Sequence, residues 1–69
     1  MKIIIAARKA LDAPIQESSA RFCLAEAVAA CDRNEPDFAY EWALRSLQYS
    51  VGIFSPIYKQ FNAHIPSAA

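Results

Sequence analysis

The sequence has no excess of charge of either sign, because its seven Lys and Arg residues balance seven Asp and Glu residues. A neutral chain lacks the electrostatic attraction that draws proteins to nucleic acid or to an anionic membrane surface. It also lacks any run approaching the roughly 18 consecutive apolar residues of a membrane-spanning helix. We therefore predict a protein with no membrane partner, and we do not expect nucleic acid to be its main partner.

Catalytic motifs are missing as well. The sequence has one histidine, His64, and no Gly-x-Ser-x-Gly, Cys-x-x-Cys, His-Glu-x-x-His, Walker or dinucleotide-binding glycine pattern. A nucleophile and base could be built only from His64 with Cys23 or Cys31, and a thiol buried on a helix face is a poor nucleophile. A metal site would need further ligands. We predict no enzymatic activity, no metal and no cofactor.

Cysteine is scarce too, with only Cys23 and Cys31, which stand eight residues apart. On a helix this spacing separates the Cα atoms by ~12 Å, beyond the reach of a disulfide. Both positions fall on the apolar side of the helix predicted for residues 15–32, where a thiol packs as a small apolar group. We predict two buried, reduced thiols, which is typical of a cytoplasmic protein.

Proline and glycine are few, and their positions divide the chain. Pro14, Pro36 and Pro56 each suit the first turn of a helix, where a missing N–H costs nothing. The single glycine, Gly52, suits the left-handed residue that ends a helix. We expect one domain over residues 1–69, with helices at approximately 2–11, 15–32, 36–52 and 56–64 and a frayed tail at 65–69. Asn34 and Ser55 are the expected N-caps of the last two helices.

The first segment leaves two alternatives open. Alanines at positions 6, 7 and 10 favour a helix, whereas the isoleucines at 3–5 could begin a strand. Such a strand would have to pair between subunits, because the sequence contains no second strand-like run. The apolar run at 3–7 also resembles the start of a secretion signal, but Arg8 and Lys9 end it before the required length.

The helices predicted at 15–32 and 36–52 are joined by a short turn, so we expect them to form an antiparallel hairpin. Alanines of the first, at 20, 27 and 30, are expected to meet Ala39, Ala43 and Leu47 of the second. Ile57, Tyr58 and Phe61 of the last helix are expected to lie over this hairpin. The predicted fold class is all-α, a small antiparallel helical hairpin extended to a three- or four-helix bundle and completed by oligomerisation.

The segment 36–54 carries more apolar surface than one helix face can bury. A first ridge contains Ala39, Tyr40, Ala43, Leu44, Leu47, Val51 and Phe54, with Ser50 among them. A second ridge contains Phe38, Trp42, Tyr49 and Ile53. The polar strip between them contains Asp37, Glu41, Arg45 and Gln48, in which Glu41 and Arg45 have the spacing of a helical ion pair. We expect this helix to be covered from two sides.

The second ridge must be covered either by the terminal helices of the same chain or by another chain. A domain of 69 residues has little room for a core, yet 55% of its residues are hydrophobic, so association is the simplest remedy. The candidate interface residues are Phe22, Phe38, Trp42, Tyr49 and Ile53. We predict a small cytosolic helical interaction module that binds itself, most simply as a homodimer, or another helical protein.

Two other functions remain open. The same apolar surface could line a pocket for a small ligand or a peptide helix. An accessory role in nucleic-acid binding could use Lys2, Arg8 and Lys9, or Arg45 beside Trp42 and Tyr49. The neutral net charge opposes the nucleic-acid alternative, and the apolar residues at 42–49 do not suit a recognition helix.

About 35 residues resemble one helical hairpin of the tetratricopeptide type. The resemblance rests on a small-residue helix, a four-residue turn around Asp37 and Phe38, and Ala39, Ala43 and Leu47 in the following helix. The Trp-Leu-Gly-Tyr pattern of that family's first helix is absent from residues 18–33, and no second copy follows. Because a single such repeat cannot bury its own face, the resemblance implies stacking against another chain.

Overall fold

The computed structural model describes residues 1–12 and 18–63. Within these ranges the protein is all-α, as predicted, and contains four helices and no strand. They are α1 (Lys2–Leu11), α2 (Ser18–Asp32), α3 (Pro36–Ser50) and α4 (Pro56–Asn62). The predicted helical residues 15–17, the position of His64 and the predicted frayed tail at 65–69 lie outside the described residues.

The first segment is a helix and not a strand. α1 places Ile3, Ile4 and Ala7 in the core, at the three- and four-residue spacing of one helix face. Ile5 points the other way and is exposed. Four of the ten residues of α1 are buried, so packing against the rest of the chain supplies the stability that so short a helix lacks in isolation.

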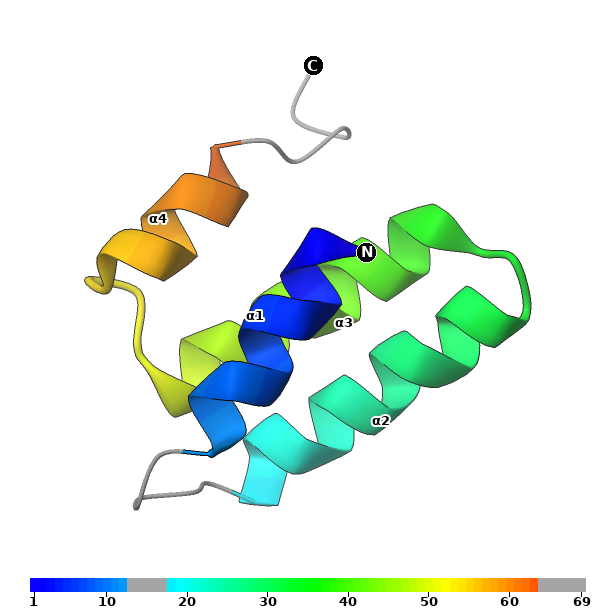
Figure 1. Ribbon diagram of the computed structural model, residues 1–69, viewed down its shortest axis with the longest axis horizontal. Coiled ribbons are helices and arrows are strands. Elements are labelled where there is room, and N and C mark those ends of the chain that lie inside the picture. Colours follow the sequence, from blue (N-terminus) through cyan, green and yellow to red (C-terminus); the bar gives the residue numbers. More distant parts are fainter. Residues whose placement is uncertain (13–17, 64–69) are drawn as a thin grey trace.

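Helices α2 and α3 run antiparallel, joined by a tight turn (Figure 1). The alanines predicted to meet between them, at 20, 27, 30, 39 and 43, are all fully buried, together with Leu47. Small side chains let two helix backbones approach closely, and the contact is therefore close along its length. Ser46 is also fully buried in this contact, and its hydroxyl donates a 2.7 Å hydrogen bond to the carbonyl oxygen of Ala20.

The turn between α2 and α3 corrects the role predicted for Asn34. Asn34 has a φ of 60°, and its N–H donates to the carbonyl of Cys31 at 3.0 Å. The N–H of Glu35 donates to the carbonyl of Ala30 at 2.9 Å. This pair of bonds is the Schellman ending of a helix. Asn34 therefore ends α2, and the residue that caps α3 is Glu35.

α3 ends beside Gly52, as predicted, but its last residue is Ser50, so the helix is two residues shorter than expected. Gly52 has a φ of 90°, and its N–H donates to the carbonyl of Leu47 at 3.2 Å. Because the chain turns here, Val51 and Phe54 do not continue the first ridge of α3. Both are exposed, and Phe54, which the sequence placed on that ridge, is 82% exposed.

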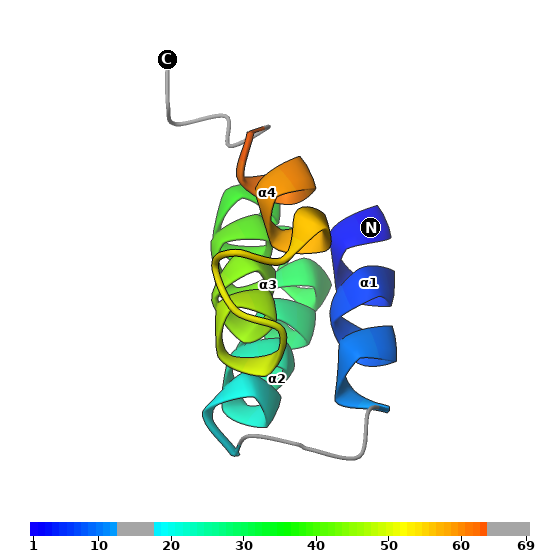
Figure 2. The same cartoon turned by 90° about the vertical axis from the view of Figure 1, so that its left-hand side faces the viewer.

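One face of the hairpin is covered by α1, and α4 packs beside α3 (Figure 2). Ile57, Tyr58 and Phe61 of α4 pack against the core, as predicted. The Tyr40 hydroxyl donates a 2.6 Å hydrogen bond to the carbonyl of Phe61, and the two rings lie 6.5 Å apart, edge to face. α4 thus contacts the first ridge of α3 and leaves the second ridge uncovered. No helix among the described residues is long and apolar enough to cross a membrane.

Candidate interaction surface

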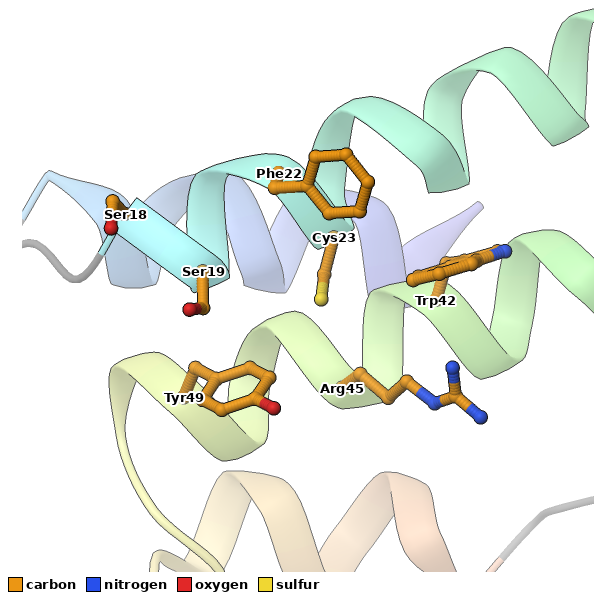
Figure 3. A pocket seen from close by; sticks show the side chains of 7 residues that line it. All are labelled: Ser18, Ser19, Phe22, Cys23, Trp42, Arg45 and Tyr49. Atoms are coloured by element: carbon orange, nitrogen blue, oxygen red, sulfur yellow. The ribbon is translucent and has the colours of Figure 1, made fainter.

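An open groove of about 380 Å³ lies between α2 and α3, on the face of the hairpin away from α1 (Figure 3). Its lining comes from the first two turns of α2 and the middle and end of α3. The lining residues are Ser18, Ser19, Phe22, Cys23, Trp42, Arg45 and Tyr49. The antiparallel hairpin explains this combination, because it sets the beginning of α2 beside the end of α3.

Trp42 lies at the centre of this surface. The ring of Phe22 meets the ring of Trp42 edge to face, with centroids 6.0 Å apart and planes at 81°. The guanidinium of Arg45 lies 5.0 Å from the centroid of the Trp42 ring, within the range of a cation–π contact. Trp42 is half-buried and also packs against the core, so its position is fixed from within.

Arg45 does not form the ion pair with Glu41 that its spacing predicted. The ion pair present among the described residues joins Arg33 and Glu35 across the turn, with a distance of 2.5 Å. This contact raises the pKa of Arg33 through the hydrogen bond and the charge of Glu35. The carboxylate of Glu41 and the guanidinium of Arg45 both remain exposed, one helical turn apart on α3.

The predicted interface residues fall into two groups. Phe22, Trp42 and Tyr49 come together in the groove lining. Phe38 lies one turn before Trp42 on the same side of α3, outside the lining. Phe22 is 60% exposed, Phe38 55% and Tyr49 51%. Ile53 is exposed beyond the end of α3 and does not line the groove, since the helical periodicity that placed it there stops at Ser50.

Arg45 was assigned to the polar strip of α3 and was set beside Trp42 and Tyr49 only in the nucleic-acid alternative, so it was missing from the predicted interface residues. It stands three residues after Trp42 and four before Tyr49, which puts it on the same stripe of the helix. That spacing is the signal in the sequence that could have added Arg45 to the predicted interface residues. We call Phe22, Phe38, Trp42, Arg45 and Tyr49 the aromatic surface.

The two cysteines differ, contrary to the prediction that both are buried. Cys23 is buried beneath the groove, whereas Cys31 is exposed. The buried stripe of α2 follows Ala20, Cys23, Ala27 and Ala30, spaced by three, four and three residues. Cys31 lies beside this stripe, in the last turn of α2. The apolar side of α2 is wider there than the part that α3 covers.

A smaller groove of about 260 Å³ lies where α1, α3 and α4 meet, lined by Met1, Lys2, Ile3, Tyr40 and Phe61. Burial raises the pKa of the Tyr40 hydroxyl here. This groove belongs to the contact that holds α4 in place. Nowhere in residues 1–12 and 18–63 do three or more His, Cys, Asp or Glu side chains gather in a way that could hold a metal ion.

Comparison of the chain with protein-family models, with curated proteins and with solved structures finds no match. No family model therefore supports the resemblance of α2 and α3 to a tetratricopeptide hairpin, and nothing below rests on it.

Proposed function

We propose that this chain is a small cytosolic helical interaction module, without catalytic activity of its own, that self-associates as a homodimer through the aromatic surface. One observation carries the proposal: no aromatic side chain in the described ranges is buried. The buried residues there are alanines together with Ile3, Ile4, Cys23, Leu44, Ser46 and Leu47. Aromatic rings usually dominate the cores of small proteins. Here half of the eight aromatic side chains lie on a face that residues 1–12 and 18–63 leave uncovered, namely Phe22, Phe38, Trp42 and Tyr49.

The size of the aromatic surface supports the proposal. An aromatic side chain can bury about 150–250 Å². With Phe22, Phe38 and Tyr49 all between 51% and 60% exposed, these three rings alone offer on the order of 300 Å². Trp42, Arg45 and the edges of the groove add to this. A standard interface takes about 800 Å² from each partner, so the aromatic surface is large enough to form its centre.

The chemistry of the surface supports it as well. Protein interfaces are enriched in tryptophan, tyrosine, phenylalanine and arginine. Substitution of a central tryptophan, tyrosine or arginine by alanine usually causes the largest losses of affinity. Trp42 is held from beneath by the core and from the side by Phe22. An anchor fixed in this way loses little conformational entropy when a partner binds.

The test is the molar mass in solution, measured by light scattering behind a sizing column over a concentration series. We expect twice the 7.6 kDa of one chain at high concentration, with dissociation on dilution. Phe38→Ala is the informative variant and Phe54→Ala its matched control, since both rings are exposed and only Phe38 belongs to the aromatic surface. A wild-type chain that stays monomeric throughout would contradict the proposal.

The groove between α2 and α3 favours a second candidate. Its volume of about 380 Å³ lies within the range of sites for small ligands, and a groove between helices can also take a peptide helix. This candidate predicts a monomer whose Trp42 fluorescence changes when a ligand enters. Monomeric mass over the whole series, followed by a fluorescence screen of aromatic carboxylates and amphipathic peptides, separates the two candidates.

A further inference from the structure

We infer that the partner is a second copy docked through α3 in an antiparallel, two-fold arrangement, in which Phe38 of each copy enters the groove of the other. The inference rests on the proposed self-association and adds its geometry. Three features of the aromatic surface support it. They are the spacing of its residues along α3, the position of Phe38 outside the groove of its own chain, and the exposed charges of Glu41 and Arg45.

The spacing comes first. Phe38, Trp42, Arg45 and Tyr49 follow one another at intervals of four, three and four residues along α3. This is the interval pattern of the contact seam in packed helix pairs. Trp42, Arg45 and Tyr49 of this stripe lie on the side of the hairpin away from α1, which Figure 3 presents. α3 therefore presents a ready seam to a second helix.

The seam is complementary to itself about a two-fold axis that runs between the two copies of α3, at right angles to both and level with the peptide bond between Ala43 and Leu44. In an antiparallel pair about that axis, Trp42 of each copy lies opposite Arg45 of the other, and Phe38 lies opposite Tyr49. The cation–π contact that Arg45 makes with Trp42 within one chain, at 5.0 Å, is then repeated between chains. A parallel pair would instead set the two Arg45 guanidinium groups against each other and align the two helix dipoles unfavourably.

The groove supplies the second feature. Tyr49 forms one end of the groove lining, beside Ser18, Ser19 and Cys23. The antiparallel register brings Phe38 of the second copy to this end. Phe38 projects from the same stripe but does not line the groove of its own chain. Each copy thus contributes one projecting ring and one groove, which is the relation that a two-fold interface requires.

The charges supply the third feature. Glu41 and Arg45 are exposed and are not paired with each other. In the proposed register, Glu41 of one copy lies only one residue, about 1.5 Å along the axis, from the level of Arg45 in the other. Arg45 belongs to the seam and Glu41 flanks it, so these two long side chains can meet across the interface. The second copy therefore offers each charge a partner that residues 1–12 and 18–63 of its own chain do not supply.

The experiment exchanges these charges. The variants are Glu41→Arg, Arg45→Glu, the double variant, and an equimolar mixture of the two single variants, all followed by light scattering over a concentration series. We expect each single variant to weaken dimerisation by at least about tenfold, because like charges then meet across the interface. The double variant and the mixture restore opposite charges between chains, and we expect both to dimerise about as tightly as the wild type.

Two controls keep the result specific. Asp32→Arg and Arg8→Glu make the same changes in net charge on exposed residues outside the aromatic surface, and they should leave dimerisation unchanged alone and when mixed. Far-ultraviolet circular dichroism checks that each variant remains helical. If a charge reversal lowers the helix content, Glu41→Gln and Arg45→Gln replace it, and each should weaken the dimer without loss of helix.

The outcomes distinguish this geometry from self-association itself. Single variants that dimerise like the wild type, with a mixture tighter than the wild type, would indicate parallel helices and overturn the geometry alone. Single variants that dissociate, with a mixture that stays dissociated, would also overturn it. A wild-type chain that is monomeric would overturn both the geometry and the proposed function.

Discussion

The hydroxyl of Ser46 donates a 2.7 Å hydrogen bond to the carbonyl oxygen of Ala20, and so joins α3 to α2 at a fully buried position. The Ala20 carbonyl can accept this bond in addition to the one within its own helix, because a carbonyl oxygen has two lone pairs. A polar side chain is tolerated in the hairpin contact for this reason. The bond fixes the position of α3 along the axis of α2.

Removing this bond is expected to destabilise the hairpin. Ser46→Ala loses the cross-helix bond, whereas Ser50→Ala loses a bond of 2.8 Å to the Ser46 carbonyl within the same helix. Both substitutions replace a serine of α3 by alanine, so their difference compares the buried cross-helix bond with bonds inside one helix. We expect Ser46→Ala to be about 1 kcal/mol less stable than Ser50→Ala in urea unfolding at matched protein concentration. Equal stabilities would mean that the buried bond contributes no more than the bonds of Ser50.

The alanine contact between α2 and α3 leaves no space for a larger side chain. Ala27 is fully buried in the core cluster, whereas Ala25, two residues earlier on the same helix, is exposed. Ala27→Leu is expected to cost about 1–3 kcal/mol of unfolding free energy by forcing the helices apart. Ala25→Leu is the matched control and should change stability by less than about 0.5 kcal/mol. Thermal and urea unfolding measure both, and an Ala27→Leu variant as stable as the control would contradict close packing.

Gly52 is required by backbone conformation and not by space. Its φ is 90°, and a Cβ at this position would meet no atom within 4 Å. Gly52→Ala is therefore expected to cost about 1–2 kcal/mol through the left-handed backbone alone. Gly52→Asn should cost less, because asparagine tolerates this region better. The order of the two midpoints in thermal unfolding checks this, and an alanine variant at least as stable as the asparagine variant would refute it.

Tyr40 is expected to make the stability sensitive to alkaline pH. Burial raises the pKa of its hydroxyl above the ordinary value, so the folded chain keeps this proton when the unfolded chain loses it. The stability that folding gains from the neutral Tyr40 hydroxyl is fully present below about pH 10, the pKa of an unperturbed tyrosine. It is lost as the pH rises through the pKa of Tyr40 in the folded chain.

The matched variants for this effect are Tyr40→Phe and Tyr58→Phe. Tyr40→Phe removes the titrating group, so its unfolding free energy should fall less steeply than that of the wild type above about pH 9.5. Tyr58→Phe leaves Tyr40 in place and should keep the wild-type slope. Urea unfolding at a series of pH values measures the slopes, and identical slopes in all three proteins would exclude Tyr40 as the source.

Much of the candidate site could be read from the sequence. The periodicity of residues 36–50 separated the ridge of Phe38, Trp42 and Tyr49 from the ridge that packs inside, and Phe22 was linked to it from α2. The structure brings Phe22, Trp42 and Tyr49 to one groove. Their role as an interface remains a prediction. Ile53 was misplaced, because a helical pattern carries no information once the chain has turned at Gly52.

The sequence by itself determined the elements that depend on neighbours along the chain. Pro36 and Pro56 mark helix starts, Gly52 marks a helix end, and the small residues of α2 and α3 identify the faces that meet. These features follow from local sterics and from the period of the helix, which act within a few residues. The first segment is different, because the sequence left helix and strand open there and α1 is held as a helix by its packing against the rest of the chain.

Only the tertiary structure decided what each face meets. Ser46 can be buried because a carbonyl oxygen of α2 lies opposite it. Cys31 is exposed because the apolar side of α2 is wider than the part that α3 covers. Arg45 lies over the ring of Trp42 and does not pair with Glu41. α4 packs on Tyr40 and so leaves the aromatic surface open. The period of a helix fixes the direction of each side chain around its axis, but burial depends on where the neighbouring helices lie, and that is set by the packing of the whole chain.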